Sequence, residues 1–137
     1  KKKSRGSPAV EPQLATLVDR PPVGDRWIHE IKFDGYRTIC RFQSGEAATF
    51  LTRTGLDWTE KYRTLQAEIQ RLPVRDVCLD GEIVALDPEG RSDFKRLQAA
   101  LKSGAEDIPL AYFVFDILEL DGRDLRPLPL IERKEIL

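Results

Sequence analysis

The chain has 137 residues and a mass of 15.6 kDa, which is the size of a single domain. Hydrophobic residues form 41% of it and charged residues 33%, a composition typical of a globular protein that excludes a collagen-like or wholly disordered chain. The net charge of −1 gives no general support for nucleic-acid binding, so a nucleic-acid partner would have to meet a local basic face.

The cysteine content and the hydropathy pattern exclude two further classes of protein. The only cysteines, Cys40 and Cys78, are too few for a disulfide scaffold and suit a reducing cytoplasm. We expect both to be small core residues. No apolar run approaches about 18 residues, so the sequence predicts no membrane span and no membrane partner.

The first half of the chain is predicted to begin with a flexible basic linker and to continue as strands. Residues 1–13 combine Lys, Ser, Gly and Pro without apolar periodicity, and residues 19–25 form a Pro-rich loop. Alternating apolar and polar residues predict strands at residues 27–33, 36–43 and 47–52, with a hairpin turn at residues 44–46.

The second half is predicted to alternate helices with two more strands. A helix of about a dozen residues begins at a cap on Thr59 and ends before Pro73, and a second helix is capped by Ser92 or Asp93. Strands are predicted at residues 76–86 and 111–120, and a third helix begins at residues 131–137. Because short turns join most of the strands, we expect an α+β fold with largely antiparallel sheets and flanking helices.

The strongest functional signal lies at residues 30–37, which read Glu-Ile-Lys-Phe-Asp-Gly-Tyr-Arg. Lys32 and Asp34 share the polar face of the predicted strand, and Gly35 and Arg37 follow them. The pattern Lys-x-Asp-Gly-x-Arg arises by chance in only roughly a few per thousand chains of this length. On its own it is also compatible with a solvated strand edge, so the neighbouring motifs decide the interpretation.

These residues resemble motif I of the covalent nucleotidyltransferases, a family that includes DNA ligases, RNA ligases and mRNA capping enzymes. Three further segments resemble family motifs in the family's order: residues 52–55 motif Ia, residues 79–84 motif III and residues 112–118 motif IIIa. The flanks, with Leu-Ala-Thr-Leu at 14–17 and His-Glu at 29–30, are similar to the ligase module of bacterial end-joining ligases of the ligase D type. The resemblance covers about residues 12–137.

The resemblance implies an ATP-grasp-like covalent nucleotidyltransferase fold, of which this chain carries part. Residues 14–137 match the N-terminal part of a ligase adenylation domain, whereas motifs IV to VI and the OB-fold domain are not found in the sequence. We therefore expect an ATP-dependent DNA ligase. Its intact form would make a lysine–AMP adduct, transfer AMP to a DNA 5′-phosphate and seal the strand in DNA repair and end joining.

The resemblance also implies a role for each motif residue. Lys32 is the expected nucleophile, and Asp34 is expected to position it and to act in the later steps. Among the expected nucleotide-binding residues, Glu30 reads the adenine edge, Phe115 stacks on adenine, and Lys32 carries the AMP. Arg37 contacts the ribose or phosphate of AMP, and Arg53 contacts a phosphate of the nucleotide or the DNA 5′-phosphate. Glu82 binds the ribose hydroxyl and a metal ion.

The resemblance finally implies ATP as the AMP donor, Mg²⁺ or Mn²⁺ as its metal ion, and nicked or broken double-stranded DNA as the substrate. End-joining proteins are the implied partners, in a bacterial cytoplasm at the nucleoid. Two other interpretations stay open. One is an RNA ligase or capping-type nucleotidyltransferase, which shares the lysine and glutamate motifs. The other is a non-catalytic module that binds a nucleotide or DNA through part of the site.

Overall fold

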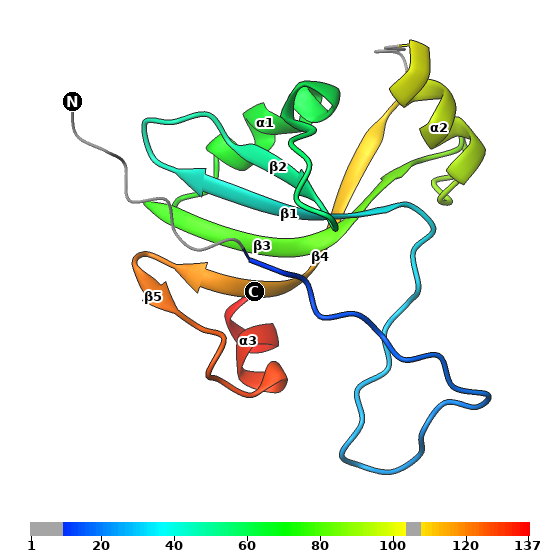
Figure 1. The fold of residues 1–137 in the computed structure, drawn as a ribbon, viewed down its shortest axis with the longest axis vertical. Coiled ribbons are helices and arrows are strands. Elements are labelled where there is room, and N and C mark those ends of the chain that lie inside the picture. The colour runs from blue at the N-terminus through cyan, green and yellow to red at the C-terminus, as the bar shows by residue number, and fades with distance from the viewer. Residues whose placement is uncertain (1–9, 104–107) are drawn as a thin grey trace.

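The computed structural model describes residues 10–103 and 108–137, and these form an antiparallel sheet of five strands flanked by short helices (Figure 1). The strands are β1 (Tyr36–Gln43), β2 (Thr49–Thr52), β3 (Asp76–Ala85), β4 (Leu110–Leu120) and β5 (Arg123–Asp124), in the order β2-β1-β3-β4-β5. The helical elements are the 3₁₀ turn η1 (Thr59–Tyr62) and the helices α1 (Arg63–Gln70), α2 (Phe94–Ser103) and α3 (Leu130–Ile136). The predicted α+β class with antiparallel pairing is confirmed.

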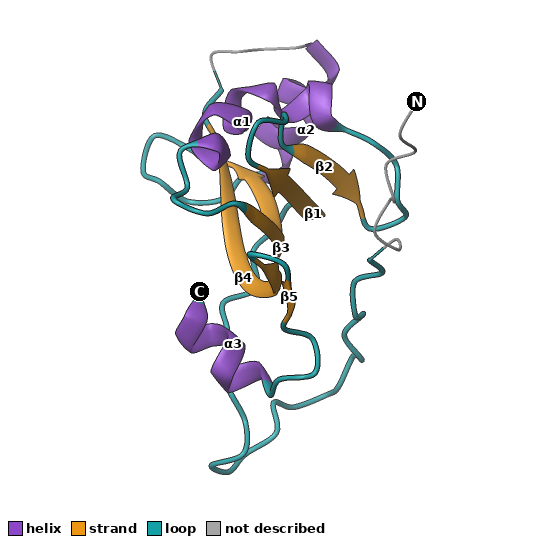
Figure 2. Cartoon of the chain, turned by 90° about the vertical axis from the view of Figure 1, so that its left-hand side faces the viewer, coloured by secondary structure: helices purple, strands orange, loops and turns teal. Residues whose placement is uncertain are grey.

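Helices α1 and α2 cover one face of the sheet, and α3 lies on the other face beside β4 (Figures 1 and 2). The main core forms between the sheet and α1 and α2, and its fully buried side chains include Cys40, Phe50, Tyr62 and Leu97. Cys78 is equally buried, but it belongs to a smaller cluster that packs separately. The prediction that both cysteines are core residues is confirmed.

The helices are short, and the two predicted helix caps have different outcomes. Asp93 caps α2 as predicted, because its Oδ1 accepts the Arg96 amide at 3.1 Å. Thr59 does not cap α1; its hydroxyl accepts the amide of Phe50 on the edge strand β2 at 2.9 Å, and η1 precedes α1. That prediction is wrong because an edge-strand amide takes the oxygen. No helix in the described part of the chain is long and apolar enough to cross a membrane.

The strand predicted at residues 27–33 does not form, so that prediction is wrong. Residues 10–35 contain no helix or strand and form a long loop outside the sheet (Figure 1). Both edges of β1 are already paired, with β2 on one side and β3 on the other, so the alternating residues find no partner strand. Ile31 is accordingly 78% exposed.

The end of the predicted linker contacts the sheet. Residues 1–9 of that linker lie outside the described residues, and residues 10–13 are described. Val10 packs against the small cluster that contains Cys78, and the carbonyl oxygen of Gln13 accepts a hydrogen bond from Arg37 at 2.5 Å. These contacts place the first described residues on the face of the sheet where α3 lies.

The pairing of β3 with β4 is irregular between Asp80 and Gly81. Asp80 pairs with Asp116 but Gly81 pairs with Val114, so Phe115 has no partner in β3. An extra residue of this kind re-aims a side chain, and Phe115 lines the face of the sheet away from the main core. Gly81 allows the strands to approach, because a Cβ at this position would lie 2.5 Å from a carbonyl oxygen of β4.

We expect Gly81→Ala to lower the free energy of unfolding by about 2–3 kcal/mol, because the new methyl group overpacks the β3–β4 contact. Gly90→Ala is the matched control: Gly90 has φ +79, but no atom lies within 4 Å of the place that its new methyl group would take, so only backbone strain of about 1 kcal/mol applies. Urea denaturation of both variants measures the two values. A cost for Gly81→Ala no larger than that for Gly90→Ala would contradict this account of the close contact.

Candidate active site

An open cleft of about 950 Å³ lies on the face of the sheet that α1 and α2 leave uncovered. Residues of β1, β3 and β4 line it together with α3 and with loop residues 10–15 and 30–33. The lining includes five of the predicted site residues, Glu30, Lys32, Arg37, Glu82 and Phe115. The fold therefore brings together side chains that lie far apart in the sequence.

Lys32 lies on the loop that precedes β1, and the residues just after it attach that loop to the sheet. Phe33 stacks on Phe113 of β4, with ring centroids 4.2 Å apart and an angle of 9° between the planes. The Gly35 amide donates a hydrogen bond to Glu82 Oε1 at 3.1 Å. A Cβ at Gly35 would overlap the backbone of β3, so glycine is required for this close approach.

Glu82 is the partly buried acid on β3 that receives this amide. Burial raises the pKa of its carboxyl group, and the Gly35 hydrogen bond and the positive charges of Lys32 and Arg37 oppose that rise. The nearby negative charge of Asp34 raises the pKa further. Because Oε1 accepts the Gly35 amide, Oε2 is the oxygen available to a ligand.

Arg37 forms a two-pronged ion pair with Asp80 on the neighbouring strand. Its Nε lies 3.0 Å from Oδ1 and its Nη2 lies 2.7 Å from Oδ2. Asp80 is only 3% exposed, so the arginine compensates a buried negative charge, and the hydrogen bonds raise the pKa of Arg37. The guanidinium also lies 5.3 Å from the ring centroid of Phe115. Arg37 thus stabilises the cleft itself, a role that the sequence did not predict.

A second ion pair balances the acid opposite Asp80. Asp116 faces Asp80 directly across β3 and β4, and two like charges in that position destabilise a sheet. Arg133 of α3 donates Nε and Nη2 to the Asp116 carboxylate at 2.8 and 2.9 Å. These hydrogen bonds raise the pKa of Arg133 and attach α3 to β4.

Lys134 follows Arg133 in α3 and reaches the rim of the cleft. Its Nζ forms an ion pair with Glu30 and donates to the backbone carbonyl oxygen of Phe115. The same nitrogen lies 6.0 Å from the centroid of the Phe115 ring. The sequence assigned no role to Arg133 or Lys134, because the role of two adjacent cations in a short helix depends on which acids the fold places beside them.

Two predicted site residues are not among the side chains that line the cleft. Asp34 is exposed on the loop after Lys32 and acts on Glu82 through its charge. Arg53 is exposed in the turn that follows β2. Their assigned roles therefore stay predictions.

The described residues contain no group of three His, Cys, Asp or Glu side chains that could hold a metal ion. Glu82 offers one carboxylate oxygen to the cleft. This donor set fits a Mg²⁺ ion held largely by nucleotide phosphates and water, because such an ion takes only one or two protein carboxylates. It does not fit an ion bound by the protein alone.

Comparison with known proteins gives consistent similarities. The family model described as "ATP dependent DNA ligase domain" matches residues 12–137. The multifunctional non-homologous end joining protein LigD of Pseudomonas aeruginosa is 42% identical over 125 residues, which cover 91% of this chain. The bifunctional LigD of Bacillus subtilis is 32% identical over 134 residues, which cover 88% of it. The chain spans only 14% and 22% of the lengths of these two relatives.

The solved structures agree with the sequence relatives. The ligase domain of Mycobacterium tuberculosis LigD matches with a TM-score of 0.70 and 34% identity. The match covers 78% of this chain and 34% of that one. A mycobacterial DNA ligase D complexed with ATP and MES matches with the same values.

We expect Glu82→Gln to be at least as stable as the parent protein at neutral pH and to lose that advantage in acid. Burial raises the pKa of folded Glu82, so the folded state binds its proton more tightly than the unfolded state does, and stability falls as the pH rises above the ordinary value of 4.5. Glutamine keeps an oxygen for the Gly35 amide but carries no charge. Melting temperatures of both proteins between about pH 3.5 and pH 8 test this; a variant that is less stable only at neutral pH would contradict it.

Proposed function

The chain belongs to the family of ATP-dependent DNA ligase domains, and on that basis we propose that Lys32 is the nucleophile that takes AMP from ATP. In this step the neutral Lys32 amine attacks the α-phosphorus. A phosphorus–nitrogen bond forms, the bond from the α-phosphorus to the oxygen bridging to the β-phosphate breaks, and pyrophosphate leaves. The proton of the amine passes to solvent. A covalent lysine–AMP adduct divides one difficult transfer into two easier ones.

The observation that carries this proposal is the convergence of a lysine, a partly buried glutamate and an aromatic ring on one cleft. Lys32 comes from the loop before β1, Glu82 from β3 and Phe115 from the irregular point of β4. Nucleotide recognition needs an acceptor for the ribose and a flat surface for the base as well as the reacting amine. A mycobacterial DNA ligase D of similar fold is complexed with ATP, which supports ATP as the ligand.

Phe115 and Glu30 are the proposed adenine-binding residues. Stacking of a base on an aromatic ring contributes roughly 1–3 kcal/mol, and it requires that the ring face a ligand instead of the core. The missing β3 partner of Phe115 gives the ring that orientation. Lys134 contacts both Glu30 and the backbone of Phe115, so Glu30 lies at the same end of the cleft as the ring. A carboxylate accepts hydrogen bonds, and the exocyclic amine of adenine donates them.

Glu82 is the proposed ribose ligand. Its Oε1 accepts the Gly35 amide, so Oε2 would be the oxygen that binds a hydroxyl group or a metal ion. Mg²⁺ or Mn²⁺ bound with the nucleotide would neutralise phosphate charge. Arg37 would add a contact to the ribose or a phosphate from the nitrogens that remain beside its pair with Asp80.

The later steps and the partners follow from the same family. AMP would pass from Lys32 to the 5′-phosphate of nicked or broken double-stranded DNA, and attack by a 3′-hydroxyl would seal the strand and release AMP. Arg53 is the proposed contact to a phosphate, and Asp34 is proposed to act in these steps. End-joining proteins are the proposed partners, because relatives that are 42% and 32% identical are named as end-joining proteins. A bacterial cytoplasmic location at the nucleoid would suit that role.

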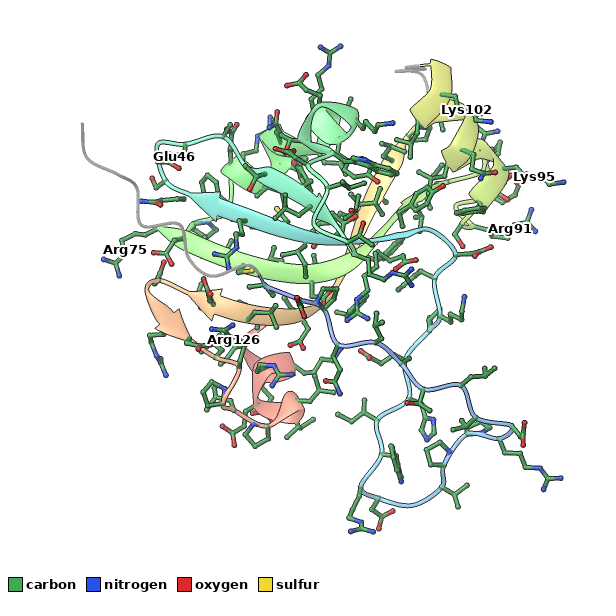
Figure 3. All side chains as sticks on the ribbon, in the orientation of Figure 1. Glu46, Arg75, Arg91, Lys95, Lys102 and Arg126 are labelled. Carbon is green, nitrogen blue, oxygen red and sulfur yellow. The ribbon has the colours of Figure 1, made fainter. Side chains whose placement is uncertain are left out.

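We expect the protein to gain the mass of one AMP when it is incubated with ATP and Mg²⁺ or Mn²⁺, and Lys32→Ala to gain none. Intact-protein mass spectrometry measures the adduct. Lys95→Ala is the matched control, because Lys95 is exposed on α2 and points away from the sheet (Figure 3).

The outcomes separate the alternatives. An adduct on Lys32→Ala would show that Lys32 is not the nucleophile. An adduct with GTP but not with ATP would favour a capping-type nucleotidyltransferase. ATP binding without any adduct, measured by calorimetry on the same samples, would favour a non-catalytic nucleotide-binding module.

A further inference from the structure

Side-chain and backbone contacts hold the loop that carries Lys32 on both sides of this residue. Residues 10–35 belong to no strand, so no ladder of backbone hydrogen bonds positions Lys32. After Lys32, the Phe33–Phe113 stack and the Gly35–Glu82 hydrogen bond attach the loop to the sheet. Before it, the side chain of Glu30 is bound to Lys134 on α3.

The position of Lys134 is itself well determined. Its neighbour Arg133 is bound to Asp116 through two nitrogens, and Nη1 of Arg133 donates to the Leu128 carbonyl oxygen at 2.5 Å. The side chain of Lys134 is 21% exposed, against 44% for Glu30. The lysine is therefore the fixed member of the pair, and the loop residue is the member that it holds.

Lys134 also binds the backbone at the irregular point of β4. Its Nζ donates to the carbonyl oxygen of Phe115, the residue without a partner in β3. One ammonium group thus joins α3, the strand that presents the aromatic ring and the loop that presents Lys32. An ion pair between two exposed side chains contributes little, but here the cation is partly buried and also donates to a backbone acceptor.

We propose that Lys134 is a positioning residue, which holds Glu30 beside Phe115 and thereby keeps the Lys32 loop over the cleft. The contact occupies Oε1 of Glu30 and leaves Oε2 free of Lys134. Lys134 touches neither the reacting amine nor, in this arrangement, a base. The part of this inference that concerns adenine rests on the proposed function; the part that concerns the loop does not.

The loop part is tested by limited proteolysis without nucleotide. Lys32 is the only lysine between residues 4 and 60, so a protease that cleaves after lysine reports the freedom of this loop by its cut at Lys32. We expect Lys134→Ala to be cut there about tenfold faster, the factor that corresponds to one charge-assisted hydrogen bond. Lys134→Arg, which keeps the charge and the donors, should be cut at close to the parent rate.

Three controls make the result specific. Cutting at Lys61, which is exposed on η1, monitors global unfolding and should not change. Lys95→Ala removes an exposed lysine from α2 and should leave the rate at Lys32 unchanged (Figure 3). Glu30→Gln should speed the cut as Lys134→Ala does, and the double variant should add little to either, because both remove one interaction. Equal cutting of parent and Lys134→Ala would overturn the proposal.

The adenine part is tested by ATP titration of adduct formation. Lys134→Ala should raise the ATP concentration for half-maximal adduct formation by a larger factor than it lowers the maximal rate. Lys134→Arg should return that ATP concentration to the parent value. If Lys134→Ala is cut faster at Lys32 but the parent protein never forms an adduct, the positioning role stands and the proposed function is rejected. If the parent protein forms an adduct on Lys32 but Lys134→Ala is cut at the parent rate, the proposed function stands and the positioning role is rejected.

Discussion

The close approach of β3 and β4 at Gly81 is the constraint on which the site depends. Asp80 pairs with Asp116 and the next residue, Gly81, pairs with Val114. Strand β4 therefore has one extra residue at this point. The leftover residue, Phe115, turns its ring to the open face. A side chain at position 81 would collide with β4 and push the two strands apart, so this pairing of β3 with β4 would no longer be favoured.

The same register creates an electrostatic problem that the surrounding elements solve. It sets two aspartates directly opposite each other, with Glu82 farther along the same strand, on the face that lines the cleft. Unpaired, these acids would repel a polyphosphate ligand. Arg37 from β1 and Arg133 from α3 each bind one aspartate and neutralise its charge, and the second pair also attaches α3 to the sheet.

Lys32, the proposed nucleophile, lies on a loop, whereas many of the other groups in the cleft lie on strands or on α3. Asp80, Glu82 and Phe115 lie on strands, whereas side-chain contacts hold the loop of Lys32 in place. In the proposed reaction, Lys32 would have to meet the α-phosphorus of ATP first and then present AMP to a DNA end. A loop fixed at a few points can move between such positions, and a strand in the middle of a sheet cannot.

The sequence by itself determined the strands at 36–43, 76–86 and 111–120 and the lysine and glutamate motifs, because alternation, turn residues and motif spacing are local. It did not determine that residues 27–33 stay unpaired, since pairing depends on which edges other strands have already taken. The motif resemblance predicted that Phe115 meets a ligand, but only the tertiary structure revealed its irregular pairing with β3 and the completion of the cleft by Arg133 and Lys134. Strand register and ion pairing join residues far apart in the chain, and no local pattern records them.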